Sequence, residues 1–208
     1  MKNAVFNRSY WLPILLIALH ACSNVAVKEP VFDKQAAYQD RAGKLAAVTQ
    51  WGFVGRISLD DGEQGGSGRL QWSVEQQNSV LDFHGALGRG AWHLEIGPEG
   101  ALLREANGIE QTAAGVNSLI QERMGWSIPV DALQWWVRGL SAPGISDIEE
   151  LDPAGLLIHL EQFDWSVDFN RYDSDAGIAL PVRLDARRGN YRVKLAVSSW
   201  LMTAAAGE

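Results

Sequence analysis

The stretch Arg69-Leu70-Gln71-Trp72-Ser73-Val74 decides the fold, because apolar and polar side chains alternate along it without interruption. Successive side chains of a β-strand point to opposite faces of a sheet, so Leu70, Trp72 and Val74 share one face. The opposite face is polar. This pattern predicts a strand in a sheet whose apolar face must be covered.

The same period of two recurs on both sides of this stretch. It is found at 53–59, 81–84, 92–96, 156–160, 165–169, 182–184 and 191–197, and Leu102-Leu103 begins a further short strand. Turn signals separate the runs, among them Asp60-Asp61-Gly62, Gly97-Pro98-Glu99-Gly100 and Gly189-Asn190. Many short antiparallel strands predict a sheet that is curled into a full or partial barrel.

Helical spacing of apolar residues occurs in the segments 34–48, 112–124 and 128–139. Glycine follows or closes the last two segments, at Gly125 and Gly139, as is typical of helix ends. These two helices interrupt the strands, and we expect them to cover the apolar face of the sheet. The covered space is then either a filled core or a cavity, since barrels of about eight or more strands can hold a small ligand.

The N-terminal region has a cationic stretch and a brief apolar run, 11–19, that stops just before Cys22. A membrane-spanning helix needs roughly 20 apolar residues, so this shorter run is typical of an export signal. Leu19-His20-Ala21-Cys22 resembles a bacterial lipobox, in which the thiol carries a diacylglycerol, although His20 departs from the small residue usual there. The alternative is an ordinary signal peptide with a chance cysteine.

Cys22 is the only cysteine, and an exported thiol without a partner is a liability unless it is used. We therefore expect a lipoprotein signal peptide over 1–21, an acylated tether over 22–33 and a single domain over 34–208. Removal of 1–21 takes away Lys2 and Arg8 and leaves 16 basic against 25 acidic residues, a formal charge of −9. Such a chain is a poor partner for nucleic acid, and its membrane attachment would depend on acyl chains.

Signatures of catalysis are missing from the sequence. It has no G-x-S-x-G elbow, no phosphate-binding loop and no His-Glu-x-x-His. His84, His93 and His159 fall on separate predicted strands, which favours half-exposed side chains over a metal site. An acid–base pair for glycoside hydrolysis could come from two acidic dipeptides, Asp60-Asp61 and Glu149-Glu150. Each dipeptide lies beside a turn signal, so both are better interpreted as solvated loop charge. We therefore expect that the protein is not an enzyme and that it has neither catalytic residues nor a metal site.

Eight of the nine tryptophans follow Cys22, and such side chains either fill a core or line an apolar pocket. Trp135 and Trp136 are adjacent on a predicted helix and project about 100° apart, so only one of them can face the sheet. A partly open apolar interior would use both, and ordinary packing is the alternative. The tryptophans on predicted strands are interpreted as core: Trp72, Trp92, Trp165 and Trp200.

Gly85-Ala86-Leu87-Gly88-Arg89-Gly90 joins two predicted strands and has one large apolar residue. Leu87 either tucks back into the core or protrudes from the tip of the loop. A single exposed leucine usually needs no explanation.

Together these segments resemble the LolB family of outer-membrane lipoprotein receptors of Gram-negative bacteria. The order and spacing of the matches hold over nearly the whole chain after Cys22, and Ala86 stands where the family often has proline. The matching segments are the lipobox at Cys22, Gly55-Arg56-Ile57-Ser58, Gly68-Arg69-Leu70-Gln71-Trp72, Gly85-Ala86-Leu87-Gly88, Gly125-Trp126-Ser127-Ile128-Pro129-Val130 with Leu133, Trp136 and Gly139, Trp165-Ser166-Val167 with Tyr172, Leu180-Pro181-Val182-Arg183-Leu184, and Trp200.

The resemblance implies an incomplete, strongly curved antiparallel β-barrel with helices covering an apolar cavity. It implies a monomer, anchored in the outer membrane and facing the periplasm, that accepts acylated lipoproteins from the soluble carrier LolA and inserts them into outer-membrane lipid. It implies no cofactor beyond a covalent diacylglycerol and N-acyl chain on Cys22, and a role in membrane delivery for Leu87. The expected cavity or lid residues are Leu133, Trp136, Trp72, Trp92 and Phe83.

Two other functions remain compatible with the pattern of residues. One is a carrier of free lipid or another hydrophobic ligand. The other is a structural lipoprotein of an envelope assembly, whose core would be filled.

Overall fold

A computed structural model of the protein describes residues 32–86, 90–125, 128–175 and 177–202. These residues belong to one compact unit, Phe32–Glu208, which has its own hydrophobic core. The predicted signal peptide, the predicted tether up to residue 31 with Cys22, and the loop residue Leu87 lie outside the described residues, so these assignments stay predictions. No helix in the described ranges is long and apolar enough to cross a membrane.

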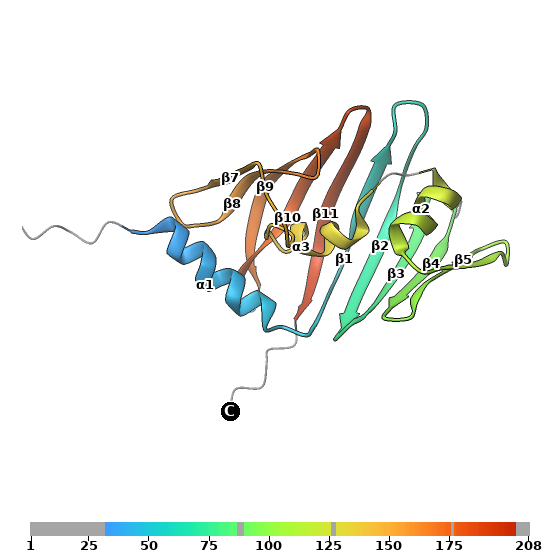
Figure 1. Cartoon of the computed structure of the whole chain (residues 1–208), viewed down its shortest axis with the longest axis horizontal. Helices are drawn as coiled ribbons and strands as arrows, with labels where there is room; N and C mark the ends of the chain where they lie inside the picture. The colour runs from blue at the N-terminus through green and yellow to red at the C-terminus, as the bar shows by residue number, and fades with distance from the viewer. Residues whose placement is uncertain (1–31, 87–89, 126–127, 176, 203–208) are drawn as a thin grey trace, which may run out of the picture. The chain divides into compact units, whose positions relative to one another are not determined.

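Eleven strands of the described residues form a single sheet in which all neighbours are antiparallel (Figure 1). Their order is β6-β5-β4-β3-β2-β1-β11-β10-β9-β8-β7. The strands are β1 (Gln50–Asp60), β2 (Gly65–Glu75), β3 (Asn78–Gly85), β4 (Trp92–Gly97), β5 (Gly100–Glu105), β6 (Glu110–Ala113), β7 (Ile148–Leu151), β8 (Leu157–Gln162), β9 (Trp165–Asp175), β10 (Ile178–Arg188) and β11 (Tyr191–Met202).

The first and last strands, β1 and β11, pair with each other in the middle of the sheet. Strands β2 to β6 extend from this pair to one edge, and β10 to β7 extend to the other. The connection between the two edge strands therefore has to cross the sheet. It carries the helices α2 (Val116–Met124) and α3 (Val130–Trp136), which lie over one face of the sheet in Figure 1.

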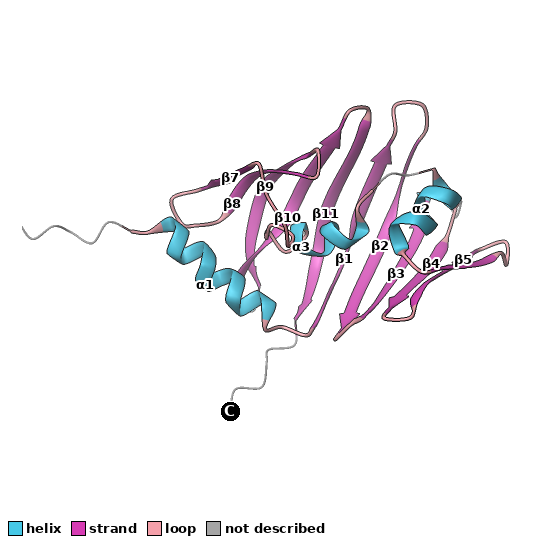
Figure 2. Ribbon diagram, viewed as in Figure 1, coloured by secondary structure: helices cyan, strands magenta, loops and turns pink. Residues whose placement is uncertain are grey.

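The sheet curls around these helices but does not close, because β6 and β7 lie at opposite edges and do not pair (Figure 2). A bulge between Val54 and Gly55 interrupts the β1–β11 register. A Cβ atom on Gly55 would lie 2.6 Å from the Ala196 carbonyl oxygen, so only glycine fits at this bend. The expected incomplete, curved antiparallel barrel is confirmed.

The helix predicted from residue 34 is confirmed as α1 (Lys34–Ala46), and the Asp33 side chain caps it by accepting bonds from the N–H groups of Gln35 and Ala36. The helix predicted over 112–124 begins later, at Val116. Residues 110–113 instead form β6, because their backbone groups pair with β5. The second predicted helix, 128–139, is shorter and spans Val130–Trp136.

Besides β6, the edge strand β7 was not expected. Glu149 and Glu150 were interpreted as loop charge, and this is wrong, because both lie in the edge strand β7. Their side chains are exposed, as an edge strand with a solvated face allows.

Side chains from the concave face of the sheet and from the helices form the core. Trp72, Trp165 and Trp200 are buried as predicted, and Trp92 is half-buried. Trp136 is fully buried while its neighbour Trp135 is half-buried, so the two do face different environments.

Candidate functional site

An apolar cavity of about 60 Å³ lies between the sheet and the covering helices. Its walls come from the central strands, from α2 and α3, and from the segment that leads into α3. Every described residue in the wall is aliphatic or aromatic: Phe53, Ile57, Leu59, Leu70, Trp72, Leu81, Trp92, Leu94, Ile120, Ile128, Val130, Leu133, Val137, Leu184, Val193 and Leu195.

Three of the five residues expected in the cavity or lid, Trp72, Trp92 and Leu133, lie in this wall. The other two, Phe83 and Trp136, are buried but are not part of the wall. No pattern in the sequence separated the two groups, since all five are large apolar residues on amphipathic elements.

Phe83 positions a wall residue. Its ring stacks on Trp92, with centroids 5.2 Å apart and planes inclined by 17°. The ring also covers Gly68 on the neighbouring strand, where a Cβ atom would lie 2.6 Å from it. Gly68 thus leaves room for Phe83, and Phe83 holds the half-buried Trp92 at the cavity.

Trp136 fixes the covering helix to the sheet instead of facing the cavity. Its Nε1 donates a hydrogen bond of 3.0 Å to Oε1 of Gln162, which is fully buried on β8. The Gln162 amide nitrogen donates to the Ala142 carbonyl (2.8 Å) and to the Ser146 hydroxyl (3.1 Å). Gln162 also accepts from the Ala142 N–H (2.9 Å), so this buried amide is fully bonded.

Two buried arginines hold the end of α3. Arg41 on α1 donates to the carbonyls of Gly139 (2.9 Å), Arg138 and Ala179 (2.8 Å). Arg138 donates to the Leu45 carbonyl (3.1 Å) and lies 4.9 Å from the centre of the Trp51 ring. Burial, with the nearby Arg41 charge, lowers the pKa of Arg138 to about 10, so its guanidinium group stays charged at neutral pH. Burial also lowers the pKa of Arg41.

The start of α3 is held less firmly. Pro129 at its N-cap makes no side-chain capping bond. Asn117 on α2 accepts a bond from the Val130 N–H (2.8 Å) and donates to the Asp131 carboxylate (2.9 Å). The beginning of α3 is therefore tied to α2, whereas its end is tied to α1 and the sheet.

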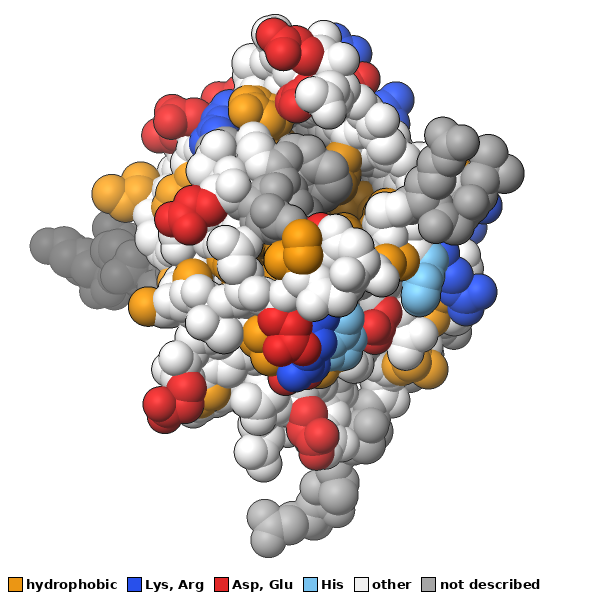
Figure 3. All heavy atoms as spheres, turned by 90° about the vertical axis from the view of Figure 1, so that its right-hand side faces the viewer, with side chains coloured by type: hydrophobic (Ala, Val, Ile, Leu, Met, Phe, Trp, Pro, Cys, Tyr) orange, Lys and Arg blue, Asp and Glu red, His pale blue; other side chains and the backbone are white. Residues whose placement is uncertain are grey.

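Charged side chains form a network on the outer face of the sheet. His93 lies 2.7 Å from Asp82 and 3.1 Å from Glu95, and Arg104 bonds both Glu95 and Glu110. Acidic, basic and histidine side chains are seen side by side on the face of the unit in Figure 3. Among the described residues no group of His, Cys, Asp and Glu could hold a metal ion.

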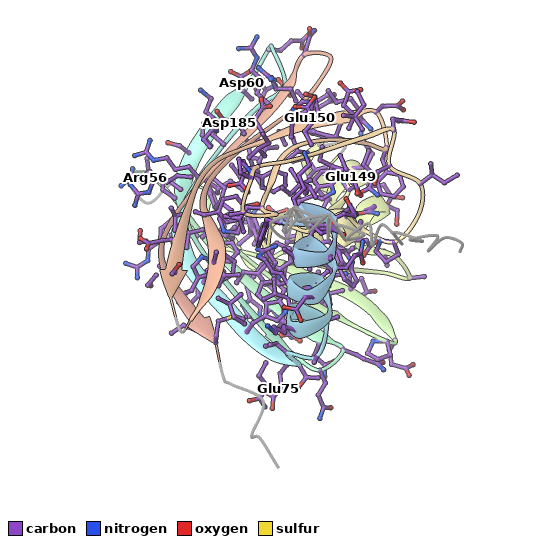
Figure 4. All side chains as sticks on the ribbon, turned by 90° about the vertical axis from the view of Figure 1, so that its left-hand side faces the viewer. Arg56, Asp60, Glu75, Glu149, Glu150 and Asp185 are labelled. Atoms are coloured by element: carbon purple, nitrogen blue, oxygen red, sulfur yellow. The ribbon has the colours of Figure 1, made fainter. Side chains whose placement is uncertain are left out.

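The two acidic pairs do not form a site together. Asp60 ends the central strand β1 and Glu149 and Glu150 belong to the edge strand β7, with four strands between them. Figure 4 labels Asp60 at the upper edge of the molecule and Glu149 and Glu150 apart from it, nearer the centre of the view. Backbone N–H groups of Gln64 and Glu63 bond the Asp61 carboxylate and lower its pKa, the opposite of what a general acid requires.

Sequence reasoning missed much of the cavity wall, including Ile120, Ile128 and Val137. Their helical spacing marked them as apolar positions but not as positions around a void. The geometry as a whole, an open curled sheet with a helix-covered apolar cavity, defines the class of proteins that enclose a hydrophobic ligand.

Comparison with known proteins shows to which family within this class the chain belongs. Residues 49–200 match the family model described as outer membrane lipoprotein LolB. The chain is 36% identical to the outer-membrane lipoprotein LolB of Alkalilimnicola ehrlichii, over 88% of this chain and 92% of that protein. It is 34% identical to the protein of the same name from Pseudomonas putida, over 89% and 92%. The chain belongs to the LolB family.

A solved structure supports the fold. A Vibrio parahaemolyticus domain described as an outer membrane lipoprotein-sorting protein superposes with a TM-score of 0.54, covering 84% of this chain and 94% of that domain at 11% identity. At this identity the likeness concerns the fold alone.

Proposed function

We propose that this protein accepts lipoproteins from a soluble periplasmic carrier of the LolA kind and inserts them into the outer membrane, to which acyl chains on Cys22 anchor it. The apolar cavity in a member of the LolB family is the observation that carries the proposal. Each CH₂ removed from water gains about 0.8 kcal/mol, so acyl chains need continuous shelter between carrier and membrane. Transfer from one apolar cavity to another provides that shelter without an energy source.

The cavity must widen to take cargo. Its volume is about 60 Å³, which is smaller than the roughly 150 Å³ of an apolar cavity that holds benzene. Since α3 is fixed at its end by Arg41 and Trp136, we propose that α2 and the start of α3 move away from the sheet. The covering helices then act as a lid that an entering acyl chain displaces.

Transfer in vitro tests the function. The compact unit has its own core, so residues 23–208 are incubated with a carrier that holds an acylated lipoprotein, and the cargo on each protein is measured. We expect the cargo to move to this chain. Folded protein that takes up no cargo would refute the proposal.

Filling the cavity tests where the cargo binds. Leu133→Trp adds bulk to the wall, and we expect it to lower the amount of accepted cargo about tenfold with the fold retained. Ile158→Trp is the matched control, because Ile158 is 40% exposed and is not in the cavity wall. Equal acceptance by both variants would place the acyl chains elsewhere.

Leu87 is proposed to act in delivery to the membrane. Leu87→Glu should leave acceptance from the carrier unchanged but reduce the cargo inserted into vesicles, because a carboxylate resists entry into lipid. Leu87→Ile keeps the apolar character and should deliver normally. Normal delivery by Leu87→Glu would contradict this role.

A further inference from the structure

The indole of Trp72 carries a hydrogen-bond donor that the described part of the chain does not use. The residue is 2% exposed, and its Nε1 has no hydrogen-bond partner among the described residues. Buried N–H groups are almost always bonded, because an unmade bond leaves the loss of hydration uncompensated. An exception in the wall of a binding cavity calls for an explanation.

No side chain of the described wall residues offers Trp72 an acceptor. The other described wall residues have only aliphatic or aromatic side chains. The nearest aromatic rings are those of Trp51 and Phe53, with centroids 5.7 and 6.0 Å from the Trp72 ring. Faces of aromatic rings are weak acceptors compared with a carbonyl oxygen.

An acyl chain brings the missing acceptor. Where the hydrocarbon of a lipid is joined to its glyceryl or amino group, the first polar atom is the carbonyl oxygen of an ester or amide. That oxygen accepts hydrogen bonds and enters an apolar cavity directly behind the chain. The wall has two indole N–H donors among its described side chains, Trp72 and Trp92, and only that of Trp72 is both fully buried and unpaired among the described residues.

We propose that Trp72 Nε1 donates a hydrogen bond to an acyl carbonyl of the cargo once the cavity has widened. This inference rests on the proposed function. It makes Trp72 a specificity residue that distinguishes acyl esters and amides from plain hydrocarbon. It also sets the depth of the bound chain, with its carbonyl at the level of Trp72, which pairs with Phe53 of β1.

Binding of two matched probes to residues 23–208 tests this role. Methyl hexadecanoate has the ester carbonyl, and heptadecane has a chain of similar length without it. The affinity of each probe is measured by displacement of a fluorescent apolar dye. The ester-to-alkane affinity ratio is then compared between the wild type and the variants, because the solubility difference between the two probes is the same for every protein and cancels. Trp72→Phe removes the N–H but keeps an aromatic ring.

We expect Trp72→Phe to lower the ester-to-alkane affinity ratio about tenfold. The variant lacks the buried N–H group, so the ester carbonyl loses its hydrogen bond while the alkane loses none. Alkane binding should change much less. Trp165→Phe is the matched control, because Trp165 is also buried with an unpaired Nε1 but is not in the cavity wall. Its ester-to-alkane ratio should equal that of the wild type.

The outcomes separate this inference from the proposed function. If neither probe binds the wild type, the proposed function fails. If both bind and Trp72→Phe keeps the wild-type ratio, or Trp165→Phe lowers it equally, the role of Trp72 is refuted.

A second pair of ligands distinguishes the sources of the carbonyl. A diacylglyceryl-cysteine peptide represents lipoprotein cargo, and phosphatidylglycerol represents membrane lipid. Weaker binding of the peptide to Trp72→Phe supports the proposal. A loss confined to phosphatidylglycerol would overturn it.

Discussion

Burial removes the hydrogen bonds that polar side chains make to water, and the buried polar side chains of this protein replace those bonds to different extents. Gln162 makes hydrogen bonds through both atoms of its side-chain amide, and Arg41 donates to backbone carbonyls. Neither Arg41 nor Arg138 pairs with a carboxylate of the described residues, so backbone carbonyls and the faces of aromatic rings stabilise their charge. Trp72 and Trp165 differ, since their N–H groups have no hydrogen-bond partner in the described part of the chain.

His93 makes stability depend on pH. Its hydrogen bond with Asp82, assisted by Glu95, raises the pKa of His93 above its ordinary value of 6.5. Folding therefore favours the protonated form of His93, and protonated His93 stabilises the folded protein. This contribution to the free energy of unfolding is fully present below pH 6.5 and is lost as the pH rises through the raised pKa of His93 in the folded protein. Because the side chain is 34% exposed, we expect less than about 1 kcal/mol.

Urea unfolding at about pH 5.5 and pH 8.5 measures this contribution. His93→Gln should reduce the free energy of unfolding at the lower pH more than at the higher pH. In an Asp82→Asn background the same substitution should have a much smaller pH-dependent effect. An equal effect of His93→Gln at both pH values would contradict the assignment.

At the scale of elements, the β2–β3 pair depends on a glycine. Gly68 lies opposite Gly85 in this ladder, and a Cβ atom on it would overlap the Phe83 ring. Gly68→Ala should destabilise the protein by about 2 kcal/mol, because overpacking displaces Phe83 and with it Trp92. Gly66→Ala in the same strand has nothing within 4 Å of its Cβ and should change stability by less than about 0.5 kcal/mol.

Thermal or urea unfolding compares the two glycine variants directly. Near-ultraviolet circular dichroism would also report the movement of Trp92. Equal stabilities would mean that Phe83 adapts without strain.

The elements also show where local patterns stop being informative. Strands with alternating apolar residues, such as β2, were predicted from the sequence. The edge strands β6 and β7 were not, because Glu110–Ala113 and Ile148–Leu151 expose most of their side chains and have no apolar face to mark them. They become strands through hydrogen bonds to β5 and β8.

At the scale of the whole molecule, the lid should be less stable than the sheet. Amide hydrogen exchange of residues 23–208 should be slowest in the central pair β1 and β11 and faster in α2 and the first turn of α3. The reason is that α2 and α3 have no side-chain N-cap bond, whereas the central strands are bonded on both sides. Exchange in α2 as slow as in β1 would contradict a lid.

Arg41→Met extends this test to the end of α3, where Arg41 bonds the carbonyls of Arg138 and Gly139. Loss of its carbonyl bonds should increase exchange at 138–140 at least tenfold. Lys44→Met is the matched control on α1, because Lys44 is 62% exposed and pairs only with Asp40 among the described residues. It should leave exchange at 138–140 unchanged.

The sequence by itself determined the class of fold and the family. Period-two alternation, turn residues and ordered motifs such as Gly68–Trp72 are local properties, and they are visible without knowledge of tertiary contacts. Only the tertiary structure decided that β1 pairs with β11, that 114–147 therefore crosses the sheet, and that Trp72 and Trp92 line the cavity while Phe83 and Trp136 do not. The physical reason is that these outcomes depend on packing and hydrogen bonds between residues far apart along the chain. The unpaired N–H of Trp72 is likewise visible only once its surroundings are known.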